Sequence, residues 1–200
     1  MNPIVRFREL YLSDARRYLD DHQYKKMQRC RWLFIKYLTG NKEPGLVYSY
    51  WMRLCSALRG KKLWLPLYFI ALNRFNHYKF KYGISIPFNT QIAKGFYIGH
   101  FGCIVVNPAV KIGKNVNISQ GVTIGATYRG GKSEVATIGD GVYIGPGAKI
   151  VGAVCIGNNV AIGANAVVTH DVPDNAVVAG VPARIISMNG AGEYVIRKVE

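Results

Sequence analysis

Residues 136–172 read ATIGDGVYIGPGAKIVGAVCIGNNVAIGANAVVTHDV, and an aliphatic residue returns at every sixth position of this stretch. A second aliphatic residue or an alanine follows each of them four positions later, and a glycine comes directly after several of them, as in IGPGAK and IGANAV. The first series is Ile138, Ile144, Ile150, Ile156, Ile162 and Val168, and the second is Val142, Ala148, Val154, Val160, Ala166 and Val172.

The same six-residue period extends upstream to about residue 88, through Ile92, Ile98, Ile104, Val110, Val116 and Val122, with a second series of Val106, Ile112, Ile118 and Ile124. A unit of six residues with two inward apolar positions is too short for a pair of helices. It is typical of a parallel β-helix, in which three short strands form one triangular coil and stability comes from stacking. The sequence therefore predicts a mainly β fold built from hexapeptide repeats.

The period is interrupted once, because Ile124 and Ile138 are 14 positions apart where six are expected. The extra residues must leave the coil, so we predict a looped insertion near residues 126–135. Loops that project from a rigid scaffold often carry recognition, and a tolerated surface insertion is the alternative.

Residues 1–84 lack the period and contain 17 aromatic residues. They also carry 17 Lys and Arg against 5 Asp and Glu, which accounts for +12 of the formal net charge of +15. Their mixed three- and four-residue apolar spacing predicts several amphipathic helices, with breaks near residues 42–45 and 59–62. Two interpretations stay open: a cap that packs on the β-helix or on a neighbouring subunit, and an interfacial anchor on an anionic membrane surface.

Several classes of protein are disfavoured by the composition. The four cysteines form no C-x-x-C pair and have no zinc-ligand spacing with the histidines, so no metal is expected. No helix-turn-helix, zinc-finger or RNA-binding signature accompanies the basic charge, so no nucleic-acid partner is expected. The N-terminus does not resemble a secretory signal, and the longest apolar run, residues 63–72, is too short to span a bilayer. We therefore expect a cytoplasmic protein, with the inner face of the cytoplasmic membrane as a second location.

His100 interrupts a mostly aliphatic row of lead positions in the segment GFYIGHFGCIVV. The edge of a coil would hold its ring in one orientation, as a general base requires. A lone histidine is also often structural, and the spacing does not decide between the two roles.

Four segments carry a resemblance to a known family: GFYIGHFGCIVV, ISQGVTIG, IGPGAKIVG and VPDNAVVAGVPARII. Over roughly residues 80–187 the chain resembles the serine acetyltransferases and related saccharide O-acetyltransferases of the hexapeptide-repeat superfamily. The resemblance implies a left-handed coil, a homotrimer with active sites between subunits, and acetyl-CoA as the acetyl donor. It also implies that His100 removes the proton from the acceptor hydroxyl, which then attacks the thioester directly.

The resemblance further implies a coenzyme A groove along the coils. Glycine and alanine occupy such corners whether or not a ligand is near, whereas an arginine suits the phosphates of the nucleotide. The positions that correspond to the groove are Gly145, Pro146, Ala164, Thr169, His170 and Arg184.

Two departures from the family concern the acceptor. Serine acetyltransferases have an aspartate where this chain has Ser85 and a second histidine where it has Val135, next to Glu134. We take Ser85 and Glu134 as candidates for orienting His100 or contacting the acceptor. Because the loss of such partners weakens binding of a small charged substrate, we expect a saccharide acceptor in surface polysaccharide biosynthesis. The short basic, aromatic N-terminal region resembles those of capsular or exopolysaccharide O-acetyltransferases, such as the colanic acid type.

The division of the chain that follows is a helical region at 1–84, an acyltransferase β-helix at 85–187 and a tail at 188–200. Two alternatives to the saccharide enzyme remain. One is a serine O-acetyltransferase of cysteine biosynthesis, and the other is a non-catalytic β-helix scaffold, since a repeat fold does not by itself imply activity.

Overall fold

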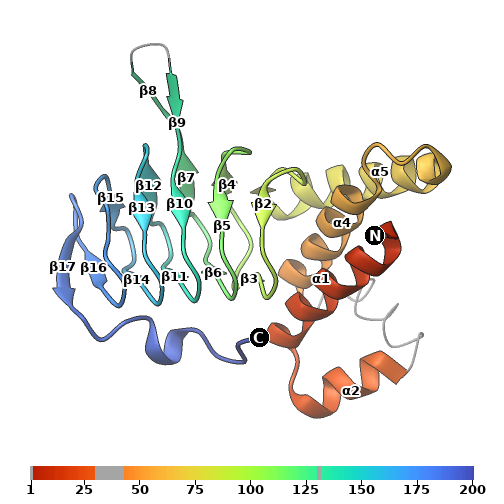
Figure 1. Ribbon diagram of the computed structural model, residues 1–200, viewed down its shortest axis with the longest axis horizontal. Helices are drawn as coiled ribbons and strands as arrows, with labels where there is room; N and C mark the ends of the chain where they lie inside the picture. The colour runs from red at the N-terminus through yellow and green to blue at the C-terminus, as the bar shows by residue number, and fades with distance from the viewer. Residues whose placement is uncertain (1, 30–42, 130–131) are drawn as a thin grey trace.

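The computed structural model describes residues 2–29, 43–129 and 132–200. Helices gather at one end of the molecule, and short strands form an elongated coil at the other (Figure 1). The break predicted at residues 59–62 separates α4 from α5. The helices are α1 (Pro3–Tyr18), α2 (Asp21–Arg29), α4 (Pro44–Leu58), η1 (Lys62–Trp64), α5 (Leu65–Tyr82) and η2 (Gly192–Tyr194).

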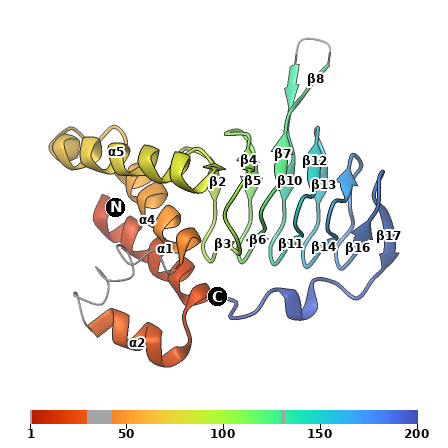
Figure 2. The same cartoon turned by 180° about the vertical axis from the view of Figure 1, so that it is seen from behind.

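Three sheets run along the coil, and successive coils add strands to each of them in parallel (Figure 2). Sheet A contains β1 (Ile84–Ser85), β4 (Ile104–Val106), β7 (Thr123–Gly125), β12 (Lys149–Val151) and β15 (Val167–Val168). Sheet B contains β2 (Gln91–Ile92), β5 (Lys111–Ile112), β10 (Thr137–Ile138) and β13 (Cys155–Ile156). Sheet C contains β3 (Tyr97–Ile98), β6 (Asn117–Ile118), β11 (Tyr143–Ile144), β14 (Ala161–Ile162), β16 (Val177–Ala179) and the antiparallel strand β17 (Arg184–Ser187).

Stacked aliphatic side chains fill the interior. Ile118 of β6 pairs in register with Ile98 on one side and Ile144 on the other, and Ile144 pairs with Ile162. All four are at most 1% exposed. The six-residue period therefore marks the inward positions, and the prediction of a hexapeptide-repeat β-helix with an N-terminal helical region is confirmed.

A two-stranded hairpin leaves the coil between β7 and β10. Its strands are β8 (Thr127–Arg129) and β9 (Lys132–Glu134), which pair antiparallel and project away from the stack (Figure 1). This is the place at which the period of the sequence is interrupted.

The helical region covers the open end of the coil through a buried ion pair. Arg53 of α4 donates from Nε to Asp14 of α1 at 2.9 Å, and these side chains are 5% and 0% exposed. Arg53 also donates to the carbonyl of Ile92 at 2.6 Å, while Asp14 accepts the backbone N–H of Phe96 at 2.8 Å. Both charges are thus paired with each other and with the first coil, which fixes α1 and α4 on the β-helix.

The tail, residues 188–200, runs back along sheet C from β17 to the helices (Figures 1 and 2). The ring of Tyr194 stacks on that of Tyr143, with centroids 4.7 Å apart. Asn117 donates to the carbonyl of Tyr194 at 2.7 Å, and Asn115 exchanges two hydrogen bonds of 2.8 Å with the backbone of Val199. The tail is therefore part of the folded structure.

Within the ranges that the structure describes, no helix combines the length and the apolar character needed to cross a bilayer.

Candidate active site

His100 lies in the corner between β3 and β4, and this corner is longer than its neighbours. Ile98 pairs with Ile118 of the next coil, and Val106 pairs with Ile124. The first coil has eight positions between its two inward residues, Ile98 and Val106, whereas the next coil has six. The two additional residues push the corner outward, and His100 is exposed. The six-residue spacing predicts that His100 belongs to the row of inward-facing positions. This prediction is wrong, because His100 lies outside the core.

The same corner bends sharply just after His100. Gly102 and Cys103 have φ values of 108° and 52°, in the left-handed region that is costly for a cysteine. Among the described residues His100 has no side-chain hydrogen bond, and Ser85 sits in β1, where it pairs with Val105. In a single chain the imidazole of His100 therefore faces solvent, and Ser85 does not orient it as we had expected.

Three of the proposed cofactor residues lie in the same row of corners as His100. Backbone hydrogen bonds connect the row, from Gly121 N to Gly102 O at 2.8 Å, from Gly147 N to Gln120 O at 2.9 Å and from Asn165 N to Pro146 O at 2.8 Å. Gly145, Pro146 and Ala164 therefore follow His100 along one edge of sheet A. A Cβ at Gly145 would stand 2.7 Å from the carbonyl oxygen of Ile162, so glycine is needed there for packing alone.

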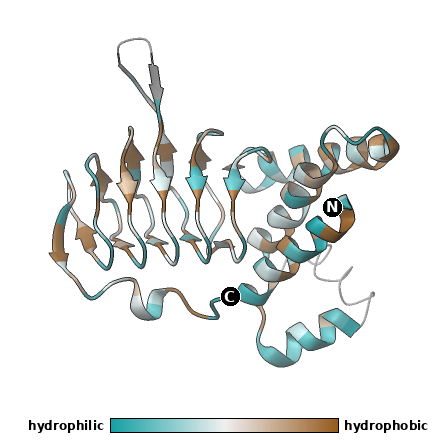
Figure 3. Cartoon of the chain, viewed as in Figure 1, coloured by the Kyte–Doolittle hydropathy of each residue, from teal (hydrophilic) through white to brown (hydrophobic). Residues whose placement is uncertain are grey.

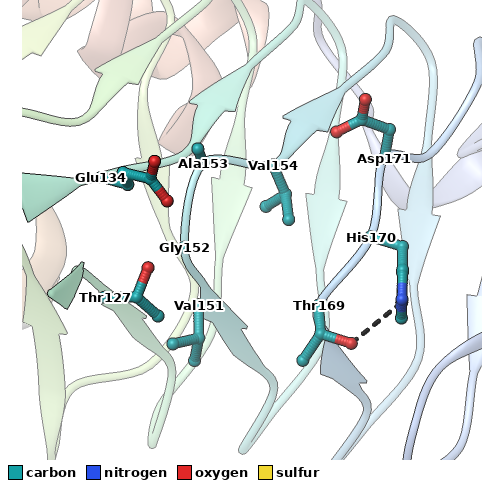
Figure 4. Close-up of a pocket in the computed structure, with 9 residues that line it drawn as sticks. All are labelled: Thr127, Glu134, Val151, Gly152, Ala153, Val154, Thr169, His170 and Asp171. Atoms are coloured by element: carbon teal, nitrogen blue, oxygen red, sulfur yellow. Dashed lines mark hydrogen bonds between the residues drawn. The ribbon is translucent and has the colours of Figure 1, made fainter. Parts of the chain in front are cut away.

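Glu134, Thr169 and His170 lie along the opposite edge of sheet A. Thr169 and His170 form one wall of a pocket of about 410 Å³, and Glu134 and Thr127 of the hairpin form the other (Figure 4). The Thr169 hydroxyl and His170 Nδ1 are 3.0 Å apart. Arg184 shares an adjoining pocket of about 310 Å³ with Thr169 and His170.

The predicted residues consequently form two groups, separated by the width of sheet A. His100 and the small corner residues are in one group, and Glu134, Thr169 and His170 are in the other. Arg184 belongs to β17 of sheet C, where it pairs with Ala179. No group of histidine, cysteine and carboxylate side chains with the arrangement of a metal site occurs in the described part of the chain.

Sequence reasoning missed two features near His100. Lys149 reaches back along the outer face of sheet A and donates to the carbonyl of Gly121 at 2.5 Å. Gln120, in the corner next to that of His100, has a buried Oε1 that accepts no hydrogen bond from the described residues. Neither residue disturbs the six-residue period, so the pattern contained no signal for them.

Comparisons with known proteins identify the family of this fold. Residues 136–170 match the family described as bacterial transferase hexapeptide (six repeats). A serine acetyltransferase of Helicobacter pylori strain J99 is 36% identical over 144 residues, which cover 72% of this chain and 82% of that protein. A serine acetyltransferase of Bacillus subtilis is 37% identical over 69% of this chain and 62% of its own length.

Solved structures give the same result. The serine acetyltransferase of Neisseria gonorrhoeae in complex with serine superposes with a TM-score of 0.69 and 27% identity, covering 92% of this chain and 70% of its own. A serine acetyltransferase in complex with CoA superposes with a TM-score of 0.59 and 34% identity, covering 72% of this chain and 57% of its own.

The fold and the row of corners that begins at His100 define a hexapeptide-repeat transferase. Within that class, the chain belongs to the serine acetyltransferase family. The predictions of an acetyl-CoA-dependent O-acetyltransferase and of acetyl-CoA as its donor are confirmed.

The prediction of a saccharide acceptor in capsular, exopolysaccharide or colanic acid biosynthesis is wrong, because the relatives found are serine acetyltransferases. Two missing contacts, at Ser85 and Val135, were too little evidence for a different substrate class.

Proposed function

We propose that this protein transfers the acetyl group of acetyl-CoA to the hydroxyl of L-serine. The observation that carries the proposal is His100, which stands outside the core in a corner two residues longer than its neighbours. The sequence resemblance implies that this histidine corresponds to the catalytic histidine of the family. The names of the relatives, which are serine acetyltransferases, support serine as the acceptor.

In this mechanism the neutral imidazole of His100 accepts the proton of the serine hydroxyl. A hydroxyl is a poor nucleophile at neutral pH, and a positioned base typically contributes about 10²–10⁴-fold to such a step. The serine oxygen forms a bond to the thioester carbonyl carbon, and the bond from that carbon to sulfur breaks. The departing thiolate takes up the proton that His100 had accepted, which gives O-acetyl-L-serine and coenzyme A and restores the neutral imidazole without an acyl-enzyme.

The coenzyme A groove is proposed to involve both edges of sheet A. Gly145, Pro146 and Ala164 line the edge that carries His100, and Thr169 and His170 line the other, with Arg184 of β17 in a pocket that adjoins them. One chain does not bring them together, whereas two copies that meet through sheet A could do so. This supports the proposal of a homotrimer, for which light scattering should give about three times the chain mass of 22.2 kDa.

A surface at the start of α5 supports the proposal of peripheral membrane association. Leu63 is 88% exposed, and Phe69 and Ile70 are each 59% exposed. Lys61 and Lys62 precede them, and this end of α5 lies far from the β-helix (Figure 3). Apolar side chains beside cations suit the anionic headgroup region. We expect the protein to float with anionic vesicles and not with neutral vesicles, and we expect the Leu63→Ser/Phe69→Ser variant to lose this binding. Equal flotation of the variant and the parent would contradict the membrane association.

A cytoplasmic location stays a prediction.

Product analysis tests the proposed reaction. Purified protein incubated with acetyl-CoA and L-serine should yield O-acetyl-L-serine, identified by mass spectrometry, in an amount equal to the free coenzyme A released. Coenzyme A release without acetylated serine would contradict serine as the acceptor.

A further inference from the structure

A pocket of about 220 Å³ lies between α1, sheet C and the tail. Its charged wall residues are Arg17 of α1 and Glu193 and Arg197 of the tail. Arg17 donates to the carbonyl of Gly95, in the corner between sheets B and C, whereas His100 lies in the corner between sheets C and A. The charged wall of the pocket is therefore apart from the catalytic corner, and the proposed reaction does not use it.

The guanidinium of Arg17 is buried without an anionic partner. Arg17 is 2% exposed, and it donates to three neutral acceptors: the carbonyl of Ile196 at 2.9 Å, the carbonyl of Gly95 at 2.9 Å and Oδ1 of Asn117 at 2.6 Å. A guanidinium has five N–H groups, so two of them remain. Burial lowers the pKa of Arg17 to about 10, and the like charge of Arg197 acts in the same direction. The side chain stays protonated at neutral pH, and the two arginines repel each other.

The chain offers no carboxylate to compensate these charges. No carboxylate of the described residues forms a salt bridge with Arg17 or with Arg197. Asp14 interacts with Arg17 electrostatically, but both of its oxygens accept hydrogen bonds from Arg53, and one of them also accepts from Ser49. The residues outside the described ranges include no Asp or Glu. Buried charges in proteins are normally paired, so Arg17 favours an anion from solution.

The tail adds one cation and one anion to the wall. Arg197 is exposed, and its hydrogen bond to the carbonyl of Tyr18 is long, at 3.4 Å. Glu193 is exposed as well and is the acid of the wall. The wall thus has two cations against one anion. A bound anion is attracted by the wall as a whole and repelled by Glu193.

We propose that this pocket binds a small oxyanion of the phosphate type, held by the two remaining N–H groups of Arg17 and by the guanidinium of Arg197. The donors come from two residues on different elements. The oxygens of a phosphate can accept from both of them, whereas a carboxylate has only two oxygens. The volume of about 220 Å³ suits inorganic phosphate or a small phosphomonoester and is too small for coenzyme A.

A bound oxyanion would connect the two ends of the chain, because Arg17 belongs to α1 and Arg197 to the tail. A ligand that binds only the folded arrangement stabilises it by an amount that rises with the ligand concentration. The tail should therefore open less often when the anion is bound. Slower amide hydrogen exchange in residues 188–200 measures this effect.

Calorimetry with inorganic phosphate, at an ionic strength held constant with potassium chloride, measures the binding. Phosphate should bind more tightly than acetate. Arg197→Gln should weaken phosphate binding about tenfold or more, because it removes a charged donor. Glu193→Gln should tighten it about two- to fivefold, because it removes a like charge. Lys198→Gln is the matched control, since Lys198 is an exposed cation of the same tail outside the pocket wall, and it should bind phosphate as the parent does.

Glycerol 3-phosphate separates the two sources of the phosphate group. Tighter binding of this ester than of inorganic phosphate would identify a phosphomonoester as the ligand, and the reverse order would identify the free ion. Hydrogen exchange locates the site, because phosphate should slow exchange in residues 188–200 of the parent and not in those of Arg197→Gln.

Four outcomes would overturn the proposal: no binding of phosphate, equal binding by the parent and Arg197→Gln, unchanged exchange of the tail at saturating phosphate, or tighter binding of acetate than of phosphate. Arg197 is exposed, so its replacement leaves the fold intact, and the circular dichroism spectrum of the variant verifies this. None of these results depends on whether the protein acetylates L-serine.

Discussion

The ion pair between Asp14 and Arg53 gives the most direct prediction about stability. Arg53→Met removes a guanidinium that is 5% exposed and makes four hydrogen bonds, two to Asp14 and one each to the carbonyls of Ile92 and Ala93. Asp14, which is 0% exposed, keeps its hydrogen bonds with the Ser49 hydroxyl and the N–H of Phe96 but loses its cationic partner. Removing one partner of a buried pair costs about 3–5 kcal/mol, since the other charge stays buried.

Urea unfolding followed by circular dichroism measures this loss. The double variant Asp14→Leu/Arg53→Met should be less destabilised than the single variant, because it leaves no uncompensated charge. Arg8→Met, an exposed position of α1, is the control and should lie within about 0.5 kcal/mol of the parent. A loss below about 1 kcal/mol for Arg53→Met would refute the reasoning that the pair holds the helical region on the coil.

Three further predictions concern the core, the tail and the thiols. Ile144→Ala removes a fully buried side chain between two stacked isoleucines and should cost about 2–5 kcal/mol in urea unfolding, while an unchanged midpoint would contradict the stacking. Tyr194→Ala should lose about 0.5–1.5 kcal/mol of ring stacking with Tyr143 and speed amide hydrogen exchange in residues 188–200; unaltered exchange would mean that the tail is held elsewhere. Burial raises the pKa of Cys55 to about 12, so Cys55 stays a protonated thiol at pH 8. Iodoacetamide should therefore label the exposed Cys103 and Cys155 first, and Cys55 only after denaturation. Mass spectrometry measures this order of labelling, and early labelling of Cys55 would contradict its burial.

The core of the β-helix was predictable because the period reports which side chains face inward. Ile112, Ile118 and Ile138, taken from the sequence alone, are at most 4% exposed. Each inward residue stacks on its equivalent one coil away, so one rule of spacing determines the whole interior. The predicted insertion coincides with the hairpin of β8 and β9, because Ile124 and Ile138 are 14 positions apart where six are expected, and a surplus of this length leaves the coil.

The corner of His100 could not be predicted by spacing, although its two extra residues lie within the periodic region. Ile98 and Ile104 are six apart, as are Val116 and Val122, so the period seems unbroken. In the coil, however, Ile98 is the equivalent of Ile118, and Ile104 precedes Val105, the partner of Thr123. The expansion becomes visible only when the strands are paired.

The packing of the tail on α1 depends on contacts between the two ends of the chain, which no local pattern contains. Arg17 and Ile196 are 179 positions apart and are joined by one hydrogen bond. The acceptor was mispredicted for a related reason. Sequence comparison with the family shows which contacts are absent at Ser85 and Val135, and two absent contacts do not identify another acceptor.

The acetyl-transfer rate of His100→Ala with saturating acetyl-CoA and L-serine tests the central claim most directly. If His100 is the general base, kcat should fall by about 10²–10⁴-fold while the binding of coenzyme A stays unchanged. A variant that retains the parent rate would contradict the account, because the reaction would then proceed without the imidazole of His100 as its base.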